Sequence, residues 1–199
     1  MSWIKIIGLE EASGRLRTVY RRVAGPNGRV DNILAVHSLR PHTLEAHMAF
    51  YKNVLHHSAN RLPPDFLEMI GVYVSVLNGC DYHVDHHAAG LAHLTDDAHA
   101  SQVRDALASG DLSRFDDREI AALRYAERLT RAPAEVDESL VSAMREAGMD
   151  DGEILEVNQV AAYFAYANRT VQGLGVTTRG DVLGLAPRNS EDPDDWGHR

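Results

Sequence analysis

The sequence has only one cysteine, Cys80, and no long run of apolar residues. A single cysteine cannot form an intrachain disulfide, so the fold must hold without covalent cross-links. No segment approaches the roughly 18 apolar residues of a transmembrane helix. The N-terminal residues also lack the basic region and the small-residue cleavage site of a secretion signal. We therefore expect a cytoplasmic protein that has no membrane partner.

Concentrated positive charge is missing as well. The formal net charge is -9, and the densest basic cluster, which lies within residues 15–22, is small and follows Glu10 and Glu11. Binding of phosphate groups needs clustered lysine and arginine side chains. Nucleic acid is therefore not an expected partner.

The rest of the composition suits a soluble helical protein. The chain of 199 residues is 44% hydrophobic and 25% charged, enough for one substantial core, with or without an arm. Apolar residues recur at helical spacing from position 31 onward, and few segments alternate as a strand would, which predicts an all-α fold. The expected helices cover about residues 41–55, 64–77, 80–94, 96–107, 116–129, 137–148 and 150–173.

The same pattern divides the chain into three parts. Residues 1–30 are expected to form an irregular N-terminal arm, because a Gly-Pro-Asn-Gly turn signal lies near its end. Residues 31–187 are expected to form the helical domain. Residues 188–199 are polar and are expected to form a mobile tail.

The reactive residues concentrate in two successive predicted helices. Glu68 lies in the first, and Cys80, His83 and His87 lie in the second. At about 100° per residue, positions 80, 83 and 87 fall within roughly 60° of arc, so their side chains can share a pocket. His86 points about 100° away from His87 and is not expected in the same group.

The helix start is expected to activate the cysteine. Cys80 follows a break at Gly79, and in a first helical turn the backbone N–H groups and the helix dipole favour a thiolate. A protonated His83 or His87 would add to this effect, and the break could fold Glu68 back over the thiol as a proton acceptor. A lone cysteine is more often a buried apolar residue, and a histidine-rich helix is usually a solvated face. The combination is what favours a reactive site.

This combination resembles the active-site motif of the alkylhydroperoxidase D and carboxymuconolactone decarboxylase superfamily, especially its peroxidase-related branch. The family pattern is a Glu followed, on the next helix, by Asn-x-Cys-x-x-Cys-x-x-x-His. Glu68, Asn78, Cys80 and His87 occupy the matching positions, and the similarity covers most of residues 35–176. The resemblance implies an alkylhydroperoxidase D-like helical fold that forms homo-oligomers. It also implies antioxidant peroxide reduction by the two cysteines, with Glu and His as a proton relay.

One departure from the family pattern changes the expected chemistry. His83 stands at the position of the second cysteine. In the two-cysteine mechanism, one thiolate becomes a sulfenic acid and the other condenses with it to a disulfide. A chain with one thiol cannot complete that step, so this mechanism is excluded here.

Three functions remain open on the sequence. In the first and preferred one, Cys80 is a redox nucleophile that reduces a peroxide without a cofactor, and an external thiol or protein reductant resolves it. Glu68 is then the base, His87 the proton relay and His83 the group that tunes the thiol. In the second, Cys80, His83, His87 and Glu68 bind zinc, iron or copper. In the third, Glu68 and His87 perform acid–base decarboxylation of a small organic acid, and the cysteine is incidental. A non-catalytic protein on the same scaffold is the remaining alternative.

Overall fold

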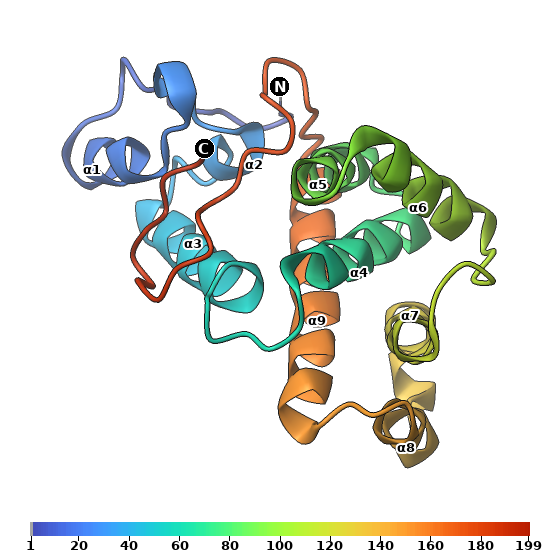
Figure 1. The fold of residues 1–199 in the computed structure, drawn as a ribbon. Helices are drawn as coiled ribbons and strands as arrows, with labels where there is room; N and C mark the ends of the chain where they lie inside the picture. Colours follow the sequence, from blue (N-terminus) through green and yellow to red (C-terminus); the bar gives the residue numbers. More distant parts are fainter. Residues whose placement is uncertain (1) are drawn as a thin grey trace.

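Nine α-helices and two short 3₁₀ helices form within residues 2–199, the part of the chain that this computed structural model describes (Figure 1). The α-helices are Gly14–Val23 (α1), Asn32–Ala35 (α2), Pro41–Leu55 (α3), Pro64–Leu77 (α4), Asp81–Leu94 (α5), Asp97–Ser109 (α6), Asp117–Arg131 (α7), Glu138–Glu146 (α8) and Asp151–Gly173 (α9), and the 3₁₀ helices are Pro26–Gly28 and Pro133–Glu135. The all-α prediction is confirmed. Each helix expected from position 41 onward is present, with ends that differ by no more than a few residues.

Local side-chain chemistry explains where two of these helices begin. Asp116 accepts a hydrogen bond from the backbone N–H of Glu119, whose carboxylate in turn accepts one from the backbone N–H of Asp116. Asp150 and Glu153 make the same reciprocal pair at the start of α9, as the sequence predicts. Each pair satisfies two N–H groups that would otherwise lack a partner.

Helix α9 is the longest element, and it contacts α3, α4, α5, α7 and α8 (Figure 1). Helix α4 crosses it, and Gly71 makes the close approach possible. A Cβ atom at Gly71 would lie 2.3 Å from the ring of Phe164, so only a residue without a side chain fits at this crossing. Phe164 is fully buried there. This contact fixes α4 against α9, and α4 carries Glu68.

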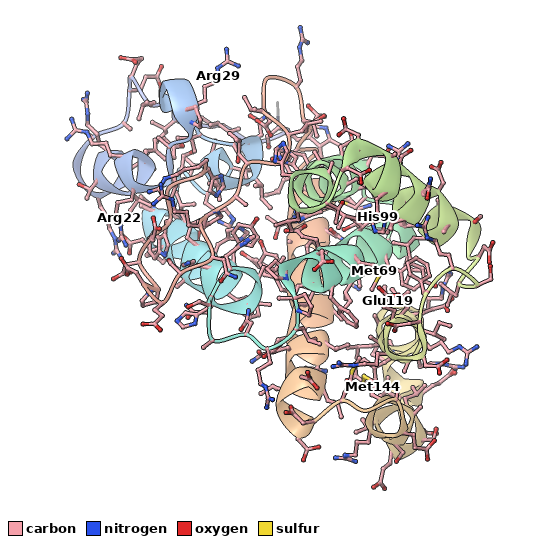
Figure 2. All side chains as sticks on the ribbon, in the orientation of Figure 1. Arg22, Arg29, Met69, His99, Glu119 and Met144 are labelled. Atoms are coloured by element: carbon pink, nitrogen blue, oxygen red, sulfur yellow. The ribbon has the colours of Figure 1, made fainter. Side chains whose placement is uncertain are left out.

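The core has two parts that share α4. The larger part joins α1, α3, α4 and α9, whereas the smaller one lies among α4, α5, α6 and α7. Met69 belongs to the smaller part and Met144 of α8 to the larger, and the two lie on the same side of the molecule in Figure 2. Helix α4 is therefore buried on nearly every face, as its apolar sequence requires.

The N-terminal arm is more ordered than expected. Residues 14–23 form α1 instead of an irregular segment, and Leu16, Val19, Tyr20 and Val23 are buried against the larger core. These positions have the spacing of one helical face, which the intervening arginines obscure in the sequence. Met1 lies outside the described residues.

The C-terminal segment, residues 174–199, packs differently from the polar, mobile tail expected for residues 188–199. Trp196 and His198 within residues 188–199 are buried, at 5% and 6% exposure. Arg22 of α1 lies over the Trp196 ring, with 3.7 Å between its Cζ atom and the ring centroid. The buried ammonium group of Lys52 donates hydrogen bonds to the carbonyl and hydroxyl oxygens of Ser190. Polar composition concealed this packing, because the contacts are made with residues far away in the sequence.

No helix among the described residues has both the length and the apolar character needed to cross a membrane.

Replacement of Gly71 by alanine is expected to destabilise the fold by about 1–3 kcal/mol, because the new methyl group overpacks the helix crossing against Phe164. Urea denaturation measures this change. Gly173→Ala is the matched control, since no atom lies within 4 Å of a Cβ at that position of α9. Equal stability of Gly71→Ala and the wild type would refute the close-packed crossing.

Candidate active site

A tight reversal between α4 and α5 brings the reactive residues together. Gly79 has a φ of +62°, the left-handed region that glycine adopts without strain. Its N–H donates to the carbonyl of Val76, and the N–H of Cys80 donates to that of Ser75. This pair of bonds ends α4 in a Schellman motif. Cys80 then serves as the N-cap residue of α5, which runs back along α4.

The reversal places His87 of α5 opposite Glu68 of α4. The Nδ1 atom of His87 lies 2.6 Å from Oε2 of Glu68, and both side chains are buried. Cys80 does not contact this carboxylate. Its Sγ atom lies 3.3 Å from Nδ1 of His83 instead. The four residues that the sequence singled out therefore form two adjacent pairs rather than one group around the thiol.

The Glu68 carboxyl group stays ionised although it is buried. Burial by itself would raise its pKa, but the charge and the hydrogen bond of His87 outweigh burial, so the pKa of Glu68 is lowered. A carboxylate bonded to Nδ1–H of an imidazole holds the ring orientation and leaves Nε2 free for a reacting group.

The thiol of Cys80 does not have the properties of an activated nucleophile. Burial raises its pKa to about 11, and the hydrogen bond from the backbone N–H of His83 only partly offsets this effect. The expected preference for thiolate is therefore reversed, because Cys80 is only 1% exposed. Burial also lowers the pKa of His83 well below its usual value. The contact therefore joins a neutral thiol and a neutral imidazole.

Phe164 orders the two imidazoles of α5. Its ring meets His87 edge-on, with the ring centroids 4.6 Å apart, and meets His83 in the same way at 5.9 Å. The rings of His83 and His87 stack on each other, with an angle of 17° between their planes. The aromatic ring at the α4–α9 crossing therefore also supports the Glu68–His87 pair.

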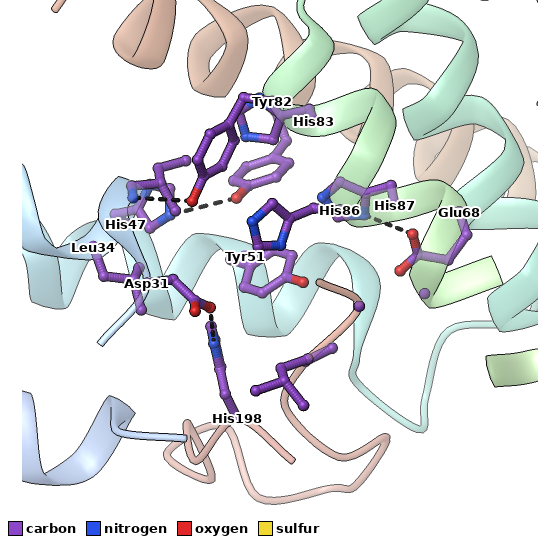
Figure 3. Close-up of a pocket in the computed structure, with 16 residues that line it drawn as sticks. Asp31, Leu34, His47, Tyr51, Glu68, Tyr82, His83, His86, His87 and His198 are labelled. Carbon is purple, nitrogen blue, oxygen red and sulfur yellow. Dashed lines mark hydrogen bonds and ion pairs between the residues drawn. The ribbon is translucent and has the colours of Figure 1, made fainter. Parts of the chain in front are cut away.

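A cavity of about 40 Å³ lies beside this pair (Figure 3). By volume it holds roughly three water molecules. Its walls come from α2, α3, α4, α5, α9 and the C-terminal segment. The polar side chains that line it are Asp31, His47, Tyr51, Glu68, Tyr82, His83, His86, His87, Tyr163 and His198. Cys80 is not among its lining residues, so a molecule in the cavity meets Glu68 and His87 but not the thiol.

Several of these lining residues have no signal in the sequence. His86 is bonded to Asp181, with 3.3 Å between Nε2 and Oδ2, and Tyr82 donates to the same carboxylate at 2.7 Å. His198 pairs with Asp31 at 2.7 Å. These partners are distant in the sequence, so helical periodicity gave no indication of them. Their only sequence signal is the unusual number of histidines, 11 in all.

The metal-binding alternative is not favoured by this geometry. Cys80 and His83 form one pair, and Glu68 and His87 form another. Within residues 2–199, no three side chains of the His, Cys, Asp or Glu type are arranged to hold a metal ion. The four-ligand shell for zinc, iron or copper that the sequence allows is therefore not assembled.

Comparison with known proteins relates the segment that carries this site to a protein family. Residues 41–128 match the model of the carboxymuconolactone decarboxylase family, whereas no curated protein matches the chain. An uncharacterized peroxidase-related protein from Ralstonia eutropha JMP134, an alkylhydroperoxidase AhpD core, has a TM-score of 0.78 and 25% identity over 90% of this chain and 93% of that chain. A second uncharacterized peroxidase-related protein, from Silicibacter sp. TM1040, has a TM-score of 0.74 and 24% identity over 87% of this chain and 90% of that chain.

The debrominase Bmp8, solved in complex with 2,3,4-tribromopyrrole, has the same fold, with a TM-score of 0.62 and 16% identity over 83% of this chain and 84% of that chain. Fold and site together define an all-helical protein with alkylhydroperoxidase D-like architecture. Glu68, Cys80 and His87 all lie within residues 41–128, the segment that matches the model of the carboxymuconolactone decarboxylase family.

Buried imidazoles in the cavity wall should make stability depend on pH. Burial lowers the pKa of His47 to about 3, whereas the unfolded chain takes up this proton near 6.5. Between these values the unfolded state binds more protons, so stability falls as the pH falls. For one such imidazole, the loss between pH 7.5 and pH 5 is about 2 kcal/mol.

Urea denaturation of His47→Gln at these two pH values should show a pH-dependent loss smaller than that of the wild type by about this amount. His42→Gln, on the exposed side of the same helix, is the control and should keep the wild-type pH dependence. An unchanged slope in His47→Gln would mean that His47 is protonated in the folded state.

Proposed function

We propose that the protein is an acid–base enzyme of the decarboxylase or lyase type, acting on a small organic acid. One observation carries the proposal: the buried Glu68–His87 pair, bonded at 2.6 Å, lines a cavity from which Cys80 is absent. The carboxymuconolactone decarboxylase family model matches the segment that contains both residues, which is consistent with this activity.

The chemistry needs one group that transfers a proton and several that hold oxygen atoms. When an acid with a nearby carbonyl loses CO₂, the electron pair of the broken C–C bond moves into an enolate, and carbon then takes up a proton. His87 can deliver or remove that proton at Nε2, while Glu68 holds Nδ1 and stabilises the charged ring. The decarboxylation consumes one proton and requires no oxidant or reductant.

Tyrosine hydroxyl groups around the cavity suit the oxygen atoms of such a substrate. Burial raises the pKa values of Tyr51 and Tyr163 well above 10, so both keep their protons and can donate hydrogen bonds. Donors in a water-poor cavity stabilise a developing oxyanion more strongly than water does. Because the cavity is small, a substrate larger than a few atoms requires part of its wall to move.

Substitution of the pair should abolish this activity, whereas loss of the thiol should not. With carboxymuconolactone as substrate, we expect His87→Asn to lower kcat by about 100-fold or more, and Glu68→Gln to lower it at least about tenfold. Cys80→Ala should retain kcat within about threefold, since Cys80 lies outside the cavity wall. The rate is measured as release of CO₂ and as the decrease in substrate absorbance. An equal loss in Cys80→Ala and His87→Asn would contradict the proposal.

A thiol-dependent peroxidase is the second candidate, and the contact between Cys80 and His83 favours it. With 3.3 Å between Sγ and Nδ1, the neutral imidazole can take the thiol proton as the sulfur attacks a peroxide, whose O–O bond breaks with loss of water or an alcohol. The sulfur would become a sulfenic acid, and a small thiol would reduce it. The peroxidase-related names of two structurally similar proteins agree with this candidate.

A second cysteine at position 83 tests the placement of this thiol. In His83→Cys the new thiol replaces the imidazole that contacts Cys80, so we expect a disulfide under mild oxidation. Thiol titration and a mass decrease of about two hydrogens would detect it. Asp81→Cys, whose side chain is exposed, is the control that should not cross-link. Failure of His83→Cys to form the disulfide would contradict the position assigned to Cys80.

A further inference from the structure

The cavity contains a second carboxylate–imidazole pair that the proposed function does not use. Nδ1 of His198 lies 2.7 Å from Oδ2 of Asp31, almost the same distance as in the Glu68–His87 pair. All four side chains are buried, and all four line the same cavity. The two pairs lie on either side of Tyr51 in Figure 3.

The second pair has a nitrogen that no described residue satisfies. Nε2 of His198 is buried and lacks a hydrogen-bond partner within residues 2–199, and the residue as a whole is only 6% exposed. An unsatisfied buried donor or acceptor costs about 1–3 kcal/mol of stability. A histidine that served only to anchor the segment would therefore destabilise the fold by about this amount. A bound molecule that hydrogen-bonds to this nitrogen would remove the cost.

Tyr51 connects the two pairs in space. Its ring meets His87 nearly edge-on, with centroids 6.3 Å apart, and meets His198 at 6.2 Å. A small molecule beside Tyr51 is therefore within reach of both imidazoles. Tyr51 is itself buried and keeps its proton, so it can bond to an oxygen of that molecule.

The C-terminal segment holds His198 in this position by several independent contacts. Asp181 accepts bonds from Tyr82 and from the backbone N–H of Asn32. Gly184, with a φ of +79°, fits against α5 where a Cβ atom would lie 2.9 Å from the backbone of Ala89. Trp196 is buried two residues before His198. The position of the imidazole is thus built into the fold.

We propose that Asp31 and His198 form a second acid–base pair of the same site, with His198 contacting a carboxylate or carbonyl oxygen of the substrate opposite His87. This inference rests on the proposed function. One imidazole transfers the proton at carbon, and the other hydrogen-bonds to the oxygen where negative charge develops, or protonates it. The division of roles needs no change in oxidation state.

Nitrogen NMR of the full-length, ¹⁵N-histidine-labelled protein tests this assignment without requiring catalysis. Acetate is the probe, because it is the smallest carboxylate with a methyl group and mimics one end of the substrate. Titration should shift the Nε2 signals of His87 and His198 together, with one dissociation constant. His198→Asn should weaken acetate binding about tenfold, the effect of losing one hydrogen bond to a charged group.

The control variant removes a contact of the same segment at a residue that does not line the cavity. His93 bonds to the carbonyl of Gly184 through Nδ1 and is not a lining residue, so His93→Asn should bind acetate as the wild type does. The wild-type titration stands even if His198→Asn fails to fold. A shift of His87 alone, with His198 unaffected, would overturn the second pair and leave the proposed function intact. A shift of neither imidazole would also overturn it.

Kinetic variants separate this inference from the proposed function. Loss of decarboxylation in His87→Asn with full activity in His198→Asn would refute the second pair alone. Retained activity in His87→Asn would refute the proposed function, whatever the acetate titration gives. Loss of activity in His87→Asn and in His198→Asn, but not in His93→Asn, is the result that we expect.

Discussion

Gly79 adopts a left-handed backbone conformation, and the hydrogen bonds that accompany it let α4 end at Leu77 and α5 begin at Asp81. In one continuous helix, Glu68 and His87, 19 residues apart, would be separated by about 28 Å. The reversal brings them to 2.6 Å. The same turn makes Cys80 the N-cap of α5, so the relative positions of Glu68, Cys80 and His87 follow from this conformation.

Burial, more than helix geometry, sets the protonation states around the cavity. Cys80 is within reach of the N–H groups at a helix start, yet removal from water dominates and raises its pKa to about 11. The same cause lowers the pKa values of His47 and His56 to about 3 and about 4. Neutral groups are favoured because an uncompensated buried charge costs several kcal/mol. Glu68 remains charged since His87 compensates it.

Relatives with this fold differ in the chemistry that their names denote, from peroxidase-related proteins to a debrominase. A shared scaffold does not fix one chemistry, because the side chains of the site are set by each sequence. In this protein the C-terminal segment supplies part of the cavity wall, and it brings Asp181 into contact with His86 and His198 into contact with Asp31. The C-terminal segment is therefore part of the candidate site as well as of the fold.

Local sequence determined the helices and the proximity of Glu68 to His87. Periodic apolar residues, the two reciprocal caps and the Asn-Gly break act over at most a few residues, so they can be read without knowing the fold. Only the tertiary structure decided that His198 meets Asp31, 167 residues away, and that Cys80 lies behind the cavity wall. Both depend on how distant surfaces exclude water from one another, and no periodicity within a single helix encodes that.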